Sequence, residues 1–224
     1  MVKSSTVDCP KRLSAVLFTP MCNFDCFYCH NRHLLTDSPV LPSCIVDEFL
    51  KKRIHFLDAI VISGGEPTLQ EDLPEFLKYL KSLSYYVKLD TNGSNPDMLK
   101  KIIEDGCVDY IAMDYKAPVE MYEEICGKGT DGEKVLESLR IIMDSNVDYE
   151  VRTTAIPQIS AKDAIKMAKD IAVVKSYVLQ LYKRPKIYKE TDQFRVLAKG
   201  RDADELMILK DDIVKYQPNT VVRA

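Results

Sequence analysis

The sequence predicts an α/β fold, an open and partial TIM-like (β/α)6 barrel with helices outside a parallel sheet. Strand-like runs alternate with helix-like stretches along the chain, which is the pattern of parallel sheets. Most of the strand-like runs are short, rich in Val, Ile and Leu, and lack strict alternation, as strands buried on both faces do. Right-handed crossovers would curl such a sheet, but six strands are too few for a closed eight-stranded barrel.

The expected elements follow in chain order. Strands are expected at 14–19, 59–63, 86–91, 110–115, 149–154 and 177–182, with an edge strand at 220–223. Helices are expected at 43–56, 73–83, 95–106, 131–145, 161–174 and 203–214. Leu73, Leu77 and Leu80 form one apolar stripe, while Asn95 before a proline predicts a helix start and Gly106 a stop.

Size and composition favour a single domain. The chain has 224 residues, of which 46% are hydrophobic, enough for one sizeable core. No internal repeat or linker-like tract divides it. We expect one domain over 1–224, with its core at about 14–182 and a C-terminal helical extension at 183–224.

Charge and cysteine content limit the function classes. The net charge of −3 does not suggest a nucleic acid or an anionic membrane surface as partner. The first ten residues have no apolar signal core, and no run approaches the ~20 apolar residues of a spanning helix. The seven cysteines are therefore expected to be reduced, in a cytoplasmic protein.

Three cysteines stand directly after the first strand. Cys22, Cys26 and Cys29 have the spacing C-x3-C-x2-C. Such crowding outside a secreted framework indicates a metal site rather than disulfides. Iron–sulfur clusters are held by cysteine thiolates, usually four. Three thiolates leave one iron without a protein ligand, and therefore open to chemistry.

A zinc site is the alternative interpretation. Cys26 and Cys29 with His30 and His33 could supply half of one. No second cysteine pair lies at a matching distance. The remaining cysteines considered stand singly, at Cys44, Cys107 and Cys126.

The cysteine motif, with Tyr28 before its last member, resembles the signature of radical S-adenosylmethionine (SAM) enzymes. The run Cys29-His30-Asn31 is similar to their glycyl-radical-enzyme activase branch. The resemblance implies a radical SAM type of partial barrel and a [4Fe–4S] cluster on the three cysteines. It also implies that the open iron binds the amino and carboxylate groups of SAM. One electron from the cluster would then release methionine and a 5′-deoxyadenosyl radical.

A glycine pair and a carboxylate follow the second strand. Gly64 and Gly65 would let a ligand approach the backbone closely, and Glu66 can accept hydrogen bonds from an ammonium group. The three residues resemble the GGEP motif of radical SAM enzymes. The resemblance implies contact with the methionine amino group of SAM, although the same sequence alone would more often form a turn.

Polar residues also end the third and fourth strands. Asp90, Thr91 and Asp114 stand in segments that resemble the activases. The resemblance implies a monovalent cation near the SAM carboxylate, and oxygen ligands suit a hard cation. The alternative is that both aspartates cap the turns or helices that follow.

Arg152 lies in the fifth strand, where an unpaired charge would be costly. Its guanidinium matches a carboxylate, and the resemblance makes it a partner of the SAM carboxylate. The alternative is a structural ion pair with Glu66, Asp90 or Asp114.

Other polar residues have weaker signals. Gln180 and Tyr182 could face ribose or adenine, and Tyr28 could lie against adenine or shield the cluster. Asn23 and Asn31 could donate hydrogen bonds to cluster sulfurs and so raise its potential. We expect surface or packing roles for His30 and His33.

The sequence most resembles anaerobic ribonucleoside-triphosphate reductase activating proteins. It lacks a second cysteine cluster, and the segment 30–42 is expected to be a mobile rim that admits a protein loop. The implied partners are a glycyl radical enzyme and an electron donor of the flavodoxin or ferredoxin type.

Two other functions remain open. One is a small-molecule radical SAM enzyme, such as a 7-carboxy-7-deazaguanine synthase-like protein. The other is a non-enzymatic metal- or cluster-binding module, which would leave Glu66, Asp90 and Arg152 unexplained.

Overall fold

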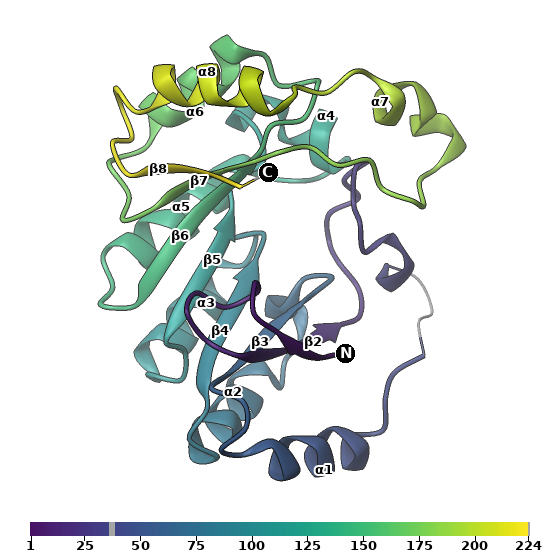
Figure 1. Cartoon of the computed structure of the whole chain (residues 1–224), viewed down its shortest axis with the longest axis vertical. Helices are drawn as coiled ribbons and strands as arrows, with labels where there is room; N and C mark the ends of the chain where they lie inside the picture. The colour runs from purple at the N-terminus through teal and green to yellow at the C-terminus, as the bar shows by residue number, and fades with distance from the viewer. Residues whose placement is uncertain (36–38, 224) are drawn as a thin grey trace.

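The computed structural model describes residues 1–35 and 39–223, and its centre is one eight-stranded sheet in the order β1 to β8 (Figure 1). From β2 to β8 all neighbours are parallel, whereas β1 runs antiparallel to β2. The strands are β1 Val2–Ser5, β2 Ser14–Thr19, β3 Ala59–Gly64, β4 Tyr86–Thr91, β5 Tyr110–Asp114, β6 Asp148–Thr154, β7 Tyr177–Gln180 and β8 Thr220–Arg223. The sheet curls but does not close, as the sequence predicted.

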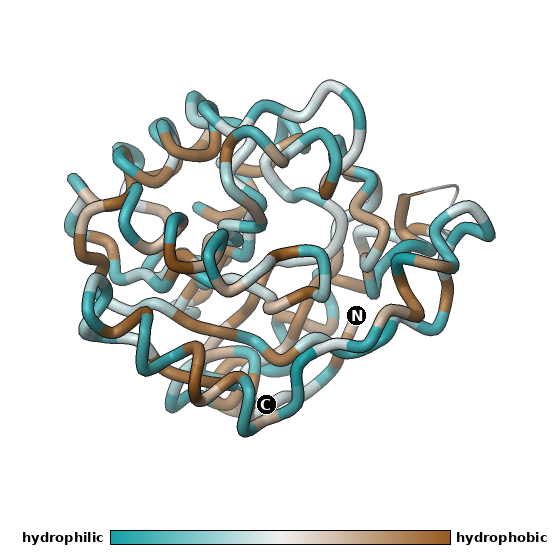
Figure 2. Tube along the Cα trace, turned by 90° about the horizontal axis from the view of Figure 1, so that it is seen from above, coloured by the Kyte–Doolittle hydropathy of each residue, from teal (hydrophilic) through white to brown (hydrophobic). Residues whose placement is uncertain are grey.

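Helices cover the outer face of this sheet (Figures 1 and 2). The longer ones are α1 Ser43–Arg53, α2 Leu73–Ser82, α3 Pro96–Glu104, α5 Gly132–Met143, α6 Ala161–Asp170 and α8 Ala203–Ile213. The shorter ones are α4 Tyr122–Cys126 and α7 Gln193–Leu197. Short 3-10 turns lie at Arg32–Leu34, Pro67–Leu69, Val119–Met121 and Glu190–Asp192.

The predicted strands and the predicted edge strand are confirmed, but the sheet has one strand more than expected. Strand β1 was missed because it is short, partly polar and largely exposed, without an apolar pattern. It pairs Val2 with Val16 and Ser5 with Ser14. At the other edge, β8 adds to β7 in parallel, so the segment after 182 is not only helical but also extends the sheet.

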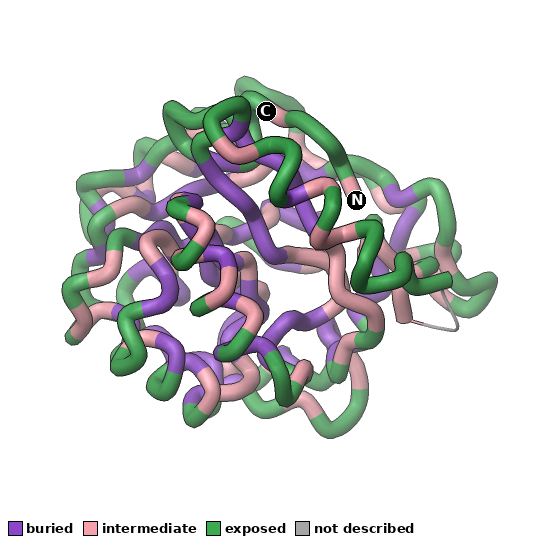
Figure 3. Tube along the Cα trace, turned by 90° about the horizontal axis from the view of Figure 1, so that it is seen from below, coloured by how far each residue is buried: buried purple, intermediate pink, exposed green. Residues whose placement is uncertain are grey.

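The two faces of the sheet carry different residues because successive strand side chains point to opposite sides. In β4, Val87 and Leu89 face the helices and belong to the main apolar core. The strands lie among the buried segments in Figure 3, while the outer helix faces are exposed. Lys88 and Asp90 alternate with the apolar pair and so take the inner face, at the point where a ligand cavity opens.

The N-terminal segment fills one end of the barrel interior. Cys9 is fully buried and packs with Val16, Ala59 and Val61 in a small second core. At the other end, near the C-terminal ends of the strands, lies a cavity of about 550 Å³. Because parallel strands end at one edge of the sheet, polar residues distant in sequence meet there.

Local signals explain the helix boundaries. The side chain of Asn95 caps α3 by accepting a hydrogen bond from the backbone N–H of Met98 at 3.2 Å. Ser160 and Asp163 form a capping box that opens α6. In the segment 30–42, expected to be mobile, residues 36–38 lie outside the described residues. Within the ranges described, no helix is long and apolar enough to cross a membrane.

Candidate active site

The cavity at the strand ends brings together most of the residues that the sequence placed in the site, but not Tyr182 or Asn23. Its lining includes Cys22, Cys26, Tyr28, Cys29, Gly64, Gly65, Glu66, Asp90, Thr91, Asp114, Arg152 and Gln180. These residues come from the loop after β2 and from the ends of β3 to β7. The structure therefore gathers one polar site from six separate stretches of chain.

The three motif cysteines are free thiols that face this cavity. Burial raises the pKa of Cys22 to about 12 and also raises the pKa of Cys29. The pKa of Cys26 lies well above its ordinary value, first because its side chain hydrogen-bonds to Cys126 and second because it is buried. Cys126, on α4, was not recognised from the sequence because it stands alone there.

This donor set fits a cluster better than a single ion. Within residues 1–35 and 39–223, no three His, Cys, Asp or Glu side chains converge as a single metal ion requires. Three thiols spread around one cavity suit a larger group, and iron must displace their protons on binding. The zinc interpretation is further weakened because His30 Nε2 lies 3.0 Å from the backbone carbonyl of Lys183.

The side chain that donates to a motif sulfur is that of Asn92, not that of Asn23 or Asn31. The backbone N–H of Phe24 also donates to Cys22 Sγ at 3.4 Å, and the backbone of Asn31 hydrogen-bonds to Cys29. Asn92 Nδ2 lies 3.7 Å from Cys22 Sγ. Asn23 donates instead to a serine hydroxyl at 2.9 Å, and Asn31 donates to the carbonyl of Gly64 at 3.1 Å. Asn92 was missed because it lies 70 residues away in sequence and approaches Cys22 only through the β4 end.

The paired glycines are needed by the cysteine loop itself. Gly64 has φ +125°, and a Cβ there would lie 2.5 Å from the backbone of Thr19. A Cβ on Gly65 would lie 1.7 Å from the carbonyl oxygen of Met21. The backbone N–H of Glu66 donates to that same oxygen at 2.8 Å. The glycines line the cavity, but they also allow the loop that bears Cys22 to lie directly against β3.

Glu66 is buried and holds only neutral donors. Its Oε1 accepts hydrogen bonds from Thr68 N at 3.1 Å, Thr68 Oγ1 at 2.6 Å and Thr91 Oγ1 at 2.8 Å. Its Oε2 accepts one, from Asn92 N at 2.7 Å. Burial raises the pKa of Glu66, and these hydrogen bonds offset only part of that rise. The carboxylate is thus held in place, with Oε2 the less occupied oxygen.

Along β4 to β6, five charged side chains form a connected cluster, called here the charged cluster. Arg152 Nε lies 2.8 Å from Asp114 Oδ1, and Arg152 Nη1 lies 3.4 Å from Asp90 Oδ1. Lys116 Nζ lies 2.9 Å from Asp114 Oδ2, and Lys88 Nζ pairs with Asp90 Oδ1. The structural ion pairs considered for Arg152 are therefore present with both aspartates.

The charges of this cluster shift the pKa of Asp114. Burial raises it, but the positive charges of Arg152 and Lys116 outweigh burial and lower it to about 2. Neighbouring charges also outweigh burial at Lys116. Burial lowers its pKa, but Asp114 and other neighbours raise it well above the ordinary value. Both groups are charged near neutral pH.

The residues expected to bind a monovalent cation have other partners. Asp90 and Asp114 both contact Arg152. Thr91 donates to Glu66 on the other side of β4 and accepts a hydrogen bond from Gly93 N at 3.1 Å. The sequence did not predict these pairings. Lys88, the partner of Asp90, lies inside β4, and a lysine inside a strand is usually expected on the solvent-exposed face.

The cavity wall also includes Tyr28 and Gln180. Tyr28 is buried, with its ring edge-on to Phe27 at 5.1 Å between centroids. Gln180 Oε1 lies 3.5 Å from the hydroxyl of Thr154. Tyr182, expected beside them, points elsewhere: its hydroxyl donates to the carbonyl of Val196 at 2.9 Å.

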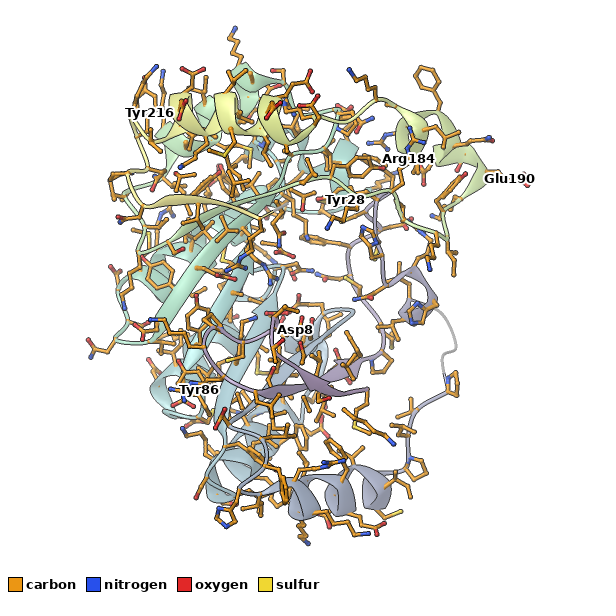
Figure 4. The ribbon with its side chains drawn as sticks, in the orientation of Figure 1. Asp8, Tyr28, Tyr86, Arg184, Glu190 and Tyr216 are labelled. Carbon is orange, nitrogen blue, oxygen red and sulfur yellow. The ribbon has the colours of Figure 1, made fainter. Side chains whose placement is uncertain are left out.

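The segment 183–201 lies beside the cysteine loop. Lys189 forms an ion pair with Asp25, and Arg195 stacks over Phe27 at 4.1 Å from the ring centroid. Figure 4 places Arg184 and Glu190 at the same outer corner, beyond Tyr28. This segment therefore forms the outer wall of the loop that holds the three cysteines.

Comparisons with known proteins agree with this geometry. A family model described as the Radical SAM superfamily matches residues 16–171. A protein of Methanocaldococcus jannaschii, named as a candidate glycyl-radical enzyme activating enzyme, is 36% identical over 231 residues. That match covers 100% of this chain and 94% of the relative.

Solved structures share the fold at low sequence identity. SuiB from Streptococcus suis bound to S-adenosylmethionine has a TM-score of 0.68 and 16% identity, over 94% of this chain and 50% of SuiB. A domain of a pyruvate-formate lyase-activating enzyme from Bacteroides vulgatus has a TM-score of 0.58 and 15% identity. It covers 74% of this chain and 99% of that domain.

Proposed function

Because this chain belongs to the radical SAM superfamily, we propose that it installs a glycyl radical on a partner enzyme, namely an anaerobic ribonucleoside-triphosphate reductase. Its cofactors are a [4Fe–4S] cluster and SAM. When bound, the cluster supplies the electron that cleaves SAM into methionine and a 5′-deoxyadenosyl radical. The full-length match to a relative named for activating a glycyl-radical enzyme is the observation that carries the proposal.

Cys22, Cys26 and Cys29 would hold the cluster. Their loop is fixed against β3 by the paired glycines and against α4 by the hydrogen bond from Asp25 N to the carbonyl of Cys126 at 2.7 Å. Such support limits movement of the ligands. The donor Asn92 would stabilise negative charge on the Cys22 thiolate, and hydrogen bonds to cluster sulfurs shift reduction potentials.

The two polar sides of the cavity would bind the amino-acid end of SAM. Glu66 offers the Oε2 oxygen to an ammonium group, with its other oxygen already fixed by three neutral donors. Arg152 offers its guanidinium to a carboxylate, which it matches in shape and charge. Tyr28 and Gln180 would line the place for adenine and ribose.

An electron donor of the flavodoxin or ferredoxin type would dock on the segment 183–201. This segment holds seven basic and two acidic residues in a chain of net charge −3, which favours an acidic partner. It also exposes Phe194 at 90% and Ile187 at 57%, side chains suited to a protein contact. Its contacts with the cysteine loop support docking of the donor beside the cluster.

The seven cysteines are all free in the structure. Free thiols in this number suit a reducing compartment, so we propose that the protein works in the cytoplasm of an organism that lives without much oxygen.

Electron paramagnetic resonance tests the activase proposal. Reconstituted protein, SAM, dithionite and the reductase should give a doublet glycyl radical signal, absent when the reductase glycine is replaced by alanine. Dithionite removes the need for the natural donor, so this test is independent of docking. SAM cleavage without any radical on the reductase, together with turnover of a small molecule, would contradict the activase proposal and support the small-molecule alternative.

A separate comparison tests donor docking. Lys186→Glu and Lys189→Glu should slow reduction by flavodoxin but leave reduction by dithionite unchanged, since only the protein donor needs the basic surface. Lys134→Glu, exposed on α5 on the outer face of the barrel, is the matched control. Equal slowing with both reductants would point to damage to the loop instead.

A further inference from the structure

The most unusual charge in the barrel is Lys88. Its side chain is only 3% exposed, and lysine is almost never fully buried unless it is paired. Its partner is Asp90, two residues later on the same face of β4. Other side chains at this end of the barrel are those of the small second core, Cys9, Val16, Ala59 and Val61.

The charged cluster has an excess of one positive charge. Its positive groups are Lys88, Lys116 and Arg152, and its negative groups are Asp90 and Asp114. The nearest further pair is balanced within itself, because Arg223 contacts both oxygens of Glu150 at 2.9 and 2.5 Å. Three positive against two negative charges leave a site suited to one more anion.

We infer that Lys88, together with Lys116 and Arg152, supplies the whole positive charge that binds the SAM carboxylate, in place of an alkali-metal ion. This inference rests on the proposal that SAM places its carboxylate at Arg152. It revises the expectation of a monovalent cation on Asp90, Thr91 and Asp114.

Each member of the cluster has a distinct part. Lys88 neutralises Asp90 from the side away from the cavity, and Lys116 shares Asp114 with Arg152. Among the described residues, Arg152 uses Nε and, more weakly at 3.4 Å, Nη1 in these contacts. Because Arg152 lines the cavity, its Nη2 is left for a ligand there. Lys88 is a positioning residue, because it forms an ion pair with Asp90 but does not itself line the cavity.

An added alkali ion would gain little here. Three carboxylate oxygens that it would use, Asp90 Oδ1 and both oxygens of Asp114, already accept charged hydrogen bonds, which are the stronger kind. It would also bring the local excess to two positive charges against a single carboxylate. The charged cluster itself therefore has no unbalanced negative charge to attract such an ion.

The test measures SAM affinity and ion uptake in reconstituted holoenzyme. In buffers whose only cation is tetramethylammonium, wild-type protein should bind SAM with the same dissociation constant before and after potassium is added. Rubidium-86, a probe for potassium, should not be retained by the wild-type SAM complex. Lys88→Met should bind SAM at least about tenfold more weakly without potassium. Potassium should restore the affinity, with one rubidium retained per SAM complex.

Two variants serve as controls. Lys81→Met removes another lysine paired with an aspartate, at 2.7 Å from Asp109 and outside the cavity, and should change neither measurement. Lys88→Arg keeps the charge and should remain independent of potassium.

Two results would overturn the inference. One is potassium-dependent SAM binding by the wild-type protein with stoichiometric rubidium, a measurement that stands even if Lys88→Met does not fold. The other is a folded Lys88→Met variant with wild-type affinity and no rubidium. Neither result depends on a partner enzyme, so the inference can fail while the activase proposal stands.

Discussion

Two acidic residues, Glu66 directly after β3 and Asp114 at the end of β5, occupy opposite electrostatic environments. Burial acts on both in the same direction, upward in pKa. Glu66 receives hydrogen bonds only from neutral donors, and its pKa stays raised. Asp114 lies between Arg152 and Lys116, and its pKa falls to about 2. The two pKa values differ because the neighbouring groups differ, not because one carboxylate is more deeply buried than the other.

This contrast indicates what each side is built to bind. A buried carboxylate without a cationic partner favours a cation, and a cluster with surplus positive charge favours an anion. The two sides face one cavity that also holds the three cysteines. We propose that such an arrangement is pre-organised for a zwitterion such as the methionine end of SAM, since its dipoles and charges are in place before binding.

Removing the [4Fe–4S] cluster should have the largest effect, because its open iron would bind both the amino and the carboxylate group of SAM. Cys22→Ala, Cys26→Ala or Cys29→Ala should abolish cluster assembly and SAM cleavage together, measured as iron and sulfide content and 5′-deoxyadenosine yield. Cys44→Ala, exposed on α1, should change neither. Full iron content in any one of the three variants would remove that cysteine from the ligand set.

On the neutral side, Glu66→Gln keeps the shape but removes the charge. Losing one partner of a desolvated charge pair costs ~2–5 kcal/mol, so SAM affinity should fall by a factor of about 30 or more. Equilibrium binding to reconstituted protein measures this, with the exposed Glu75→Gln on α2 as control. Wild-type affinity in Glu66→Gln would return Glu66 to a purely structural role.

On the charged side, Arg152→Lys keeps the charge but loses the planar fork. We expect SAM affinity to fall by roughly tenfold, about the worth of one charged hydrogen bond, while the cluster still assembles. Arg140→Lys, exposed on α5, is the matched control. An unchanged dissociation constant would show that Arg152 serves only its two aspartates.

Lowering the pH should affect Glu66 and Asp114 differently. Glu66 has a raised pKa, so as pH is lowered it should gain a proton before an ordinary glutamate does, and SAM affinity should weaken. Glu66→Gln should lose that dependence. Asp114 has a lowered pKa, so its contribution to folding stability, roughly 2 kcal/mol, is complete above pH 3.8 and lost as pH falls through about 2. A flat affinity profile in the wild type would contradict the first expectation.

The sequence predicted some residues of the site and missed others. The cysteines, Glu66 and Arg152 were recognised because their spacing and neighbours are distinctive, and all line one cavity. Lys88 and Asn92 were missed because their roles depend on which strands become neighbours. The partner of a buried charge is a property of the fold, and a single sequence does not display it.

The fold shows a similar limit. The parallel strands carry apolar runs that identify them, and all were predicted. Strand β1 has no such run and is held by its pairing with β2. The prediction that Tyr182 faces the ligand was wrong for a related reason. Nothing in its local sequence shows that the segment 183–201 folds back and accepts a hydrogen bond from its hydroxyl, through the carbonyl of Val196.

The binding of SAM and of decarboxylated SAM to the wild type, Glu66→Gln and Arg152→Lys shows which group of the ligand each residue contacts. Arg152→Lys should bind SAM roughly tenfold more weakly but bind decarboxylated SAM nearly as the wild type does, since the carboxylate is already gone. Glu66→Gln should weaken both ligands, because both keep the amino group. Equal losses for the two ligands in Arg152→Lys would contradict the claim that the charged cluster binds the carboxylate of SAM.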